Sequence, residues 1–117
     1  MTWQLSPPPP DLAQHYVERG LWNDDVLGTF VARELGRGAE TRFRIWSRSR
    51  ARIDRLAGID RDARRLAACL RARGIGAGDA VAFQLPNWRE AAVSFYAIAY
   101  TGAVLVPIVH FYGPREV

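Results

Sequence analysis

The sequence has 117 residues, of which 49% are hydrophobic and 24% charged, and its formal net charge is +4. These values are ordinary for one globular domain and exclude a chain that is disordered throughout. The single cysteine excludes an internal disulfide, and the first residues lack the basic start and apolar core of a signal peptide, so we expect a cytoplasmic protein. All 16 basic residues are arginine, which excludes any mechanism that requires a lysine amine.

The N-terminal part predicts a tail followed by two helices. Residues 1–10 end in four prolines, which favour an extended, disordered, Pro-rich tail. Asp11 to Arg19 predicts a short helix in which His15 is packed rather than acting as a ligand. A second helix is predicted from a cap at Asn23, with Gly36 just past its end. Its core-facing stripe consists of Val26, Leu27, Phe30, Val31 and Leu35.

The middle of the chain predicts a β-hairpin and a long helix. Residues 41–47 alternate between apolar and polar side chains, which is the period of a half-exposed strand. The segment RSRARIDRLAG, residues 48–58, is expected to return as the second strand of the hairpin. A helix is then predicted over residues 59–73 and ends at Gly74. Cys69 is expected to be a buried structural thiol beside the apolar face of this helix.

A strand–helix–strand unit spans Asp79 to Pro107, and the rest of the chain is organised around it. Val81–Leu85 and Val104–Val106 are short apolar runs, the pattern of buried strands. Two strands joined by a crossover helix are parallel, and such crossovers are almost always right-handed. The sequence therefore predicts an α/β fold with parallel strands, crossover helices and an early β-hairpin.

The helix between these two strands has recognisable ends. Asn87 is expected to cap its first turn, because its side chain can accept a backbone N–H, and Glu90 adds negative charge three residues later. Gly102 is expected to end the helix in the left-handed conformation. The apolar face predicted between these ends consists of Ala91, Ala92, Phe95, Ile98 and Ala99.

Two patterns suggest other classes of protein, and each has a simpler interpretation. Residues 91–114 carry no charged side chain, but Gly102 and Pro107 interrupt any continuous helix, so we expect no transmembrane segment. Residues 37–73 hold twelve arginines and four acidic residues without an aromatic platform at fixed spacing. We therefore expect a solvated basic surface and no nucleic acid partner.

Residues suited to chemistry are sparse. The segment GIGAGD lacks the third glycine of a dinucleotide-binding fingerprint, because position 79 is Asp, and it follows a helix instead of a strand. No nucleophile triad, carboxylate pair or metal-ligand spacing is present, so we predict no catalytic, cofactor-binding or metal-binding residue. His110 lies just beyond the second parallel strand, at the edge where open α/β sheets bind ligands. We predict that it contacts a substrate; the alternative is a loop histidine without a ligand.

Three motifs in this order resemble the N-terminal region of AMP-forming acyl- and aryl-acid–CoA ligases, the adenylate-forming superfamily, with the fatty-acid–CoA ligase type included. Leu66–Asp79 resembles the segment written LAxxLxxxGvxxGD, Val81–Glu90 resembles VaixlpNxxe, and Gly102–Pro107 resembles GAvxvP. With the match of RIWSRSR to the early hairpin of the family, the resemblance covers residues 20–117.

The resemblance implies both a reaction and a place in a larger domain. In this family a carboxylic acid reacts with ATP to give an acyl-adenylate and pyrophosphate, CoA then displaces AMP, and Mg²⁺ assists. The large N-terminal domain holds ATP and the acid. We therefore expect residues 11–117 to be an incomplete N-terminal portion of that domain, and GPRE near the end resembles the first turn of another helix.

The chain also departs from the family pattern. The phosphate loop ending in P-K-G, the adenine-contacting segment, the acidic ribose ligand and the catalytic lysine have no counterpart. Leu56 and Gly58 replace the usual Tyr and Glu of T-Y-x-E-L, and Val109 and His110 replace Asn-Pro. We expect a fragment that is inactive alone. ATP, CoA and Mg²⁺ are expected to bind only when the fragment is combined with the remainder of a split ligase. The alternative is a non-catalytic interaction module that docks on a partner ligase chain.

Overall fold

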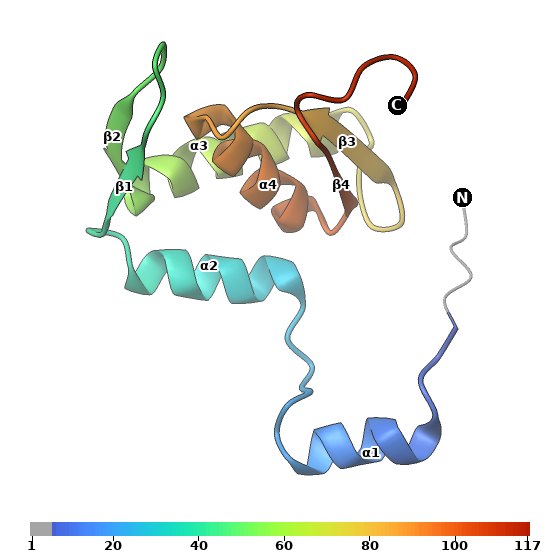
Figure 1. Ribbon diagram of the computed structural model, residues 1–117. Helices are drawn as coiled ribbons and strands as arrows, with labels where there is room; N and C mark the ends of the chain where they lie inside the picture. Colours follow the sequence, from blue (N-terminus) through green and yellow to red (C-terminus); the bar gives the residue numbers. More distant parts are fainter. Residues whose placement is uncertain (1–5) are drawn as a thin grey trace.

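The computed structural model describes residues 6–117, in which four helices and four strands follow one another (Figure 1). The predicted tail lies outside the described residues at positions 1–5, and Pro10 already opens the first helix, where a proline loses no helical hydrogen bond. The elements in chain order are α1 (Pro10–Glu18), α2 (Leu27–Arg37), β1 (Arg42–Ile45), β2 (Arg52–Arg55), α3 (Leu56–Ala72), β3 (Ala80–Gln84), α4 (Arg89–Thr101) and β4 (Val104–Ile108).

The strands form two separate pairs. β1 and β2 make an antiparallel hairpin in which Phe43 lies opposite Asp54. β3 and β4 are parallel, with Gln84 opposite Ile108, and α4 crosses between them. These pairings confirm the predicted α/β fold with an early hairpin. β3 and β4 are half-exposed instead of fully buried. α4 packs against them, but in the described part of the chain no further strand lies beside the pair.

The core lies between the helices, and small side chains let them approach closely. Fully buried alanines join α3 to α4, and a second cluster joins α2 to α4. At Gly28 of α2 a Cβ would lie 2.7 Å from the carbonyl oxygen of Ala99, so only glycine fits this contact without a shift. Leu56, one of the departures from the family pattern, packs against the second cluster. The two clusters are Ala63, Ala67 and Ala97, and Val31, Leu35 and Ala99.

The predicted start of α2 is wrong. The helix begins at Leu27, after Val26, and no side chain caps it. The carbonyl of the Asn23 side chain instead accepts the backbone N–H of Asp25 at 2.8 Å, which closes a local turn four residues before the helix. α2 also runs through Gly36, and of its predicted stripe only Val31 and Leu35 are buried.

The predicted cap of α4 is also wrong. The residue before its first turn is Trp88, which is extended and makes no side-chain cap. The backbone N–H of Trp88 donates to the carbonyl of Pro86 at 2.6 Å, and this turn shifts Asn87 out of the capping position. Gly102 ends α4 with φ 77°, as predicted.

Two residues expected inside the protein are exposed. Cys69 lies two positions beyond buried Ala67, about 200° around α3, so its thiol faces solvent. His15 is exposed because α1 lies apart from the other helices (Figure 1). Across residues 6–117, no helix has the length and apolar character that a membrane span requires.

Candidate functional site

An open groove of about 600 Å³ lies where β3 and β4 end, at the edge that the sequence predicts for ligand binding. The carboxyl ends of both strands lie at this edge because the strands are parallel. Residues of α4, of β3 and β4 near their ends, and of the segment after β4 line the groove, and Phe43 adds to the lining from the hairpin. The lining residues are Phe43, Phe83, Leu85, Asn87, Ala91, Ala92, Phe95, Tyr96, Pro107, Ile108, Val109 and His110.

The segment that carries His110 is held in place by β3. The side-chain amide of Gln84 donates to the carbonyl of Val109 at 3.1 Å and to that of Tyr112 at 2.7 Å. The His110 ring packs edge-on against Phe111, with 5.3 Å between the ring centroids. The structure thus places His110 in the groove with Asn87, whereas His15 and Cys69 lie elsewhere. The role of Gln84 has no local signal in the sequence, because its partners lie 25 and 28 residues away.

Arg89, the first residue of α4, fixes the hairpin wall of the groove. Its Nε donates to Oδ2 of Asp54 on β2 at 2.6 Å, and its Nη2 donates to Oδ2 of Asp62 on α3 at 2.6 Å. Nη2 also donates to the carbonyl of Gly58 at 3.1 Å. A Cβ at Gly58 would lie 2.5 Å from Oδ1 of Asp54, so the glycine makes room for the bridge. One guanidinium therefore joins three elements, and β2 in turn positions Phe43.

The charges in this bridge support one another. The hydrogen bond from Arg89 holds the pKa of Asp54 below its ordinary value and does the same for Asp62. Partial burial acts to lower the pKa of Arg89, but the two carboxylates outweigh it and the pKa is raised. All three groups stay charged near neutral pH.

We predict an acid-sensitive stability that depends on Arg89. An aspartate whose pKa is lowered by folding stabilises the fold at a pH above its ordinary pKa of 3.8 and loses that contribution as the pH falls through the lower folded pKa. The melting temperature should therefore fall as the pH drops below about 4, and it should fall less steeply in Arg89→Met. Thermal unfolding followed by circular dichroism at neutral and acidic pH measures this. Equal acid sensitivity in the two proteins would contradict it.

The hairpin is tied to α4 a second time at its turn. The Arg50 guanidinium lies 4.3 Å from the centroid of the Trp88 ring and 3.5 Å from a carboxylate oxygen of Glu90. Both contacts are exposed, and each contributes about 1 kcal/mol or less. They align the hairpin with the start of α4, but Arg89 is the stronger link.

The groove suits the apolar body of a ligand better than a phosphate group. Its lining contains no carboxylate and no arginine, and its polar side chains are Asn87, Tyr96 and His110. Within residues 6–117 no cluster of three His, Cys, Asp or Glu side chains could hold a metal ion. These donors do not fit ATP with Mg²⁺, whose phosphates and metal require cations and carboxylates.

Comparison with known proteins identifies the family to which the chain belongs. A family model described as AMP-binding enzyme matches residues 57–117. The medium-chain fatty-acid–CoA ligase of Escherichia coli (strain K12) is 34% identical over 93 residues, which cover 80% of this chain and 16% of that protein. The 4-coumarate–CoA ligase 4 of Arabidopsis thaliana is 42% identical over 66 residues, 56% of this chain and 12% of that protein. The chain thus spans less than a fifth of these relatives.

Solved structures agree with this assignment. The Mycobacterium smegmatis MbtA apo structure matches 95% of this chain and 20% of its own with a TM-score of 0.76 and 32% identity. The anthranilate CoA ligase AuaEII, in complex with anthranoyl-AMP, matches 79% of this chain and 17% of its own with a TM-score of 0.63. At 22% identity the second likeness shows the fold alone. The chain belongs to the AMP-binding enzyme family, with the fold of the N-terminal part of the large domain of adenylate-forming ligases.

Proposed function

We propose that this chain is the N-terminal segment of an acid–CoA ligase, which converts a carboxylic acid, ATP and CoA to an acyl-CoA, AMP and pyrophosphate through an acyl-adenylate. One observation carries the proposal: a chain 34% identical to a fatty-acid–CoA ligase places an apolar groove with His110 at the carboxyl edge of its parallel strands. The proposal includes a role in fatty-acid metabolism and a cytoplasmic location, where ATP and CoA are available.

In this proposal the chain contributes a wall of the acid-binding site. The apolar lining excludes water from the body of the acid, and His110 at the exposed rim offers a hydrogen bond. ATP, Mg²⁺ and CoA are held by residues outside this chain, since it has no lysine and no phosphate loop. The isolated chain is therefore expected to be inactive.

The role of His110 can be tested in a chimera, defined as the Escherichia coli medium-chain enzyme with its matching segment replaced by this chain. In that protein His110→Ala should raise KM for the acid about fivefold to tenfold, the value of one lost hydrogen bond. KM for ATP should not change, because the groove does not fit the nucleotide. Steady-state kinetics with both substrates varied measures the split.

A matched control is His15→Ala, which removes a histidine from α1, outside the groove lining. It should leave both KM values unchanged. If His110→Ala behaved like His15→Ala, His110 would be a loop histidine and the acid would be held elsewhere.

The second candidate function is a non-catalytic module that docks on a partner ligase chain. It is favoured by the parallel pair β3–β4, whose outer edges are unpaired in the described part of the chain. Such edges can add a strand from a partner. A tagged form of this chain that co-purifies with a ligase lacking the segment would support the module. Activity of the chimera would support the covalent segment instead.

A further inference from the structure

The outer face of the hairpin carries two large apolar side chains in solvent. Trp46, directly after β1, is 86% exposed, and Ile53 on β2 is 65% exposed. Arg44 pairs with Ile53 across the strands, so their side chains share a face, and Trp46 follows Arg44 at a spacing of two. The inner face of the same hairpin carries Ile45, which is buried. The exposure of Trp46 and Ile53 is therefore a property of one face.

Positive charge surrounds these apolar side chains. Arg42 and Arg44 alternate with the inner residues of β1, and Arg48 lies in the turn; all three are exposed. Among the described residues, none of the three forms an ion pair, whereas Arg50 pairs with Glu90 and Arg55 with Glu40. The outer face thus combines uncompensated cations with a tryptophan and an isoleucine.

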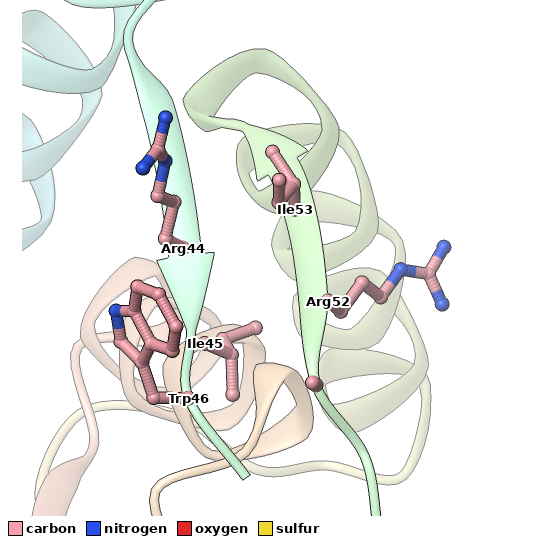
Figure 2. A pocket seen from close by; sticks show the side chains of 6 residues that line it. Arg44, Ile45, Trp46, Arg52 and Ile53 are labelled. Atoms are coloured by element: carbon pink, nitrogen blue, oxygen red, sulfur yellow. The ribbon is translucent and has the colours of Figure 1, made fainter.

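The hairpin presents this face as a fixed surface. Its turn is closed by the Ser47 hydroxyl, which accepts the backbone N–H of Arg50 at 3.2 Å. A shallow hollow of about 310 Å³ lies between the strands. Figure 2 shows Arg44 on β1 beside Trp46, which directly follows the strand, with Ile53 on the neighbouring strand and the Arg52 side chain pointing away from Trp46. In Figure 1 the turn projects beyond the helices.

We propose that the hairpin docks on the surface of a bilayer that contains anionic lipids. Tryptophan prefers the interface between headgroups and acyl chains, where its ring is apolar and its N–H stays hydrogen-bonded. Unpaired arginines beside it attract anionic headgroups, each contributing about 1 kcal/mol near the surface. Ile53 adds apolar area that enters the same layer.

Other partners fit this surface less well. A packed protein interior would have to desolvate Arg42, Arg44 and Arg48 without carboxylates to pair them. A nucleic acid would use the arginines, but it offers no apolar layer for Ile53, and one exposed tryptophan is not a stacking platform. The proposal does not depend on the ligase reaction, because binding to lipid is measured without substrates.

Flotation of the full chain with vesicles tests the proposal. Vesicles of equal parts phosphatidylcholine and phosphatidylglycerol should carry the protein upward in a density gradient, and vesicles of phosphatidylcholine alone should not. Flotation separates bound protein from aggregates, which sink. Arg44→Gln should weaken the apparent affinity about fivefold, and Arg42→Gln with Arg44→Gln about 25-fold. Trp46→Ser should weaken it at least about fivefold.

Matched controls distinguish the hairpin from the general charge of the protein. Arg65→Gln removes the same charge from the exposed side of α3 and should leave binding unchanged. Circular dichroism confirms that each variant keeps its helices. Equal losses in Arg65→Gln and Arg44→Gln would overturn the proposal, since binding would then follow net charge. Failure of the native chain to float, or tighter binding to single-stranded DNA lost in the same hairpin variants, would also overturn it.

Discussion

Replacing Arg89 with methionine is expected to lower the free energy of unfolding by about 2–3 kcal/mol, at or below the lower end of the range for a buried ion pair because the bridge is only partly buried. The Arg89 side chain is only 14% exposed and joins Asp54, Asp62 and the carbonyl of Gly58. Methionine fills most of the volume but removes the guanidinium that joins the carboxylates of Asp54 and Asp62. Urea unfolding followed by circular dichroism measures the loss.

Two further substitutions sharpen this result. Arg89→Lys keeps the charge but lacks the planar fork that reaches three acceptors, so it should retain only part of the stability. Arg61→Met removes an arginine that is exposed on α3 and lies 3.6 Å from Asp62, and it should change the free energy by no more than about 0.5 kcal/mol. If Arg89→Met were as mild as Arg61→Met, the bridge would not hold the hairpin.

Enlarging a side chain in the contact between α3 and α4 should lower the free energy of unfolding by a similar amount. Ala67 has no exposed surface and packs with Ala63 and Ala97 where the two helices meet. Ala67→Leu adds three carbon atoms to a space without room for them, which should cost about 2–3 kcal/mol as the helices are forced apart. The same urea titration measures this loss.

The neighbouring residue offers a control of identical chemistry. Ala68 lies on the exposed side of α3, so Ala68→Leu should stay within about 0.5 kcal/mol of the native protein. Leucine and alanine are both good helix formers, and helix propensity therefore contributes little in either variant. Comparable stability of the two variants would mean that the helices are not closely packed at Ala67.

The elements that the sequence predicted correctly are those with a strong local pattern. Residues 41–47 alternate with the period of a strand, the segments around β3 and β4 are short apolar runs, and the glycine at position 102 is suited to the left-handed end of α4. His110 lies at the edge of the parallel pair, as its place after β4 indicates, because topology determines where parallel strands end; its contact with a substrate stays a prediction.

The predictions that failed concern features decided by packing. Asn23 and Asn87 are both suitable caps by residue type, but local turns move them away from the helix starts. Cys69 is next in sequence to an apolar position of α3, but its thiol lies on the exposed side of the helix. Arg89 binds carboxylates that lie 35 and 27 positions earlier in the sequence, and no local sequence pattern predicts a contact over such a separation.

Carboxylate-dependent exchange of pyrophosphate into ATP by the chimera tests the proposed ligase function most directly. We predict exchange with a medium-chain fatty acid in the chimera and none in the isolated chain, because the proposed function assigns a wall of the acid site to this chain and the nucleotide-binding residues to the remainder of the enzyme. A folded chimera without exchange, compared with the active parent enzyme, would contradict the proposed function. Exchange by the isolated chain would contradict the expectation that it is inactive alone.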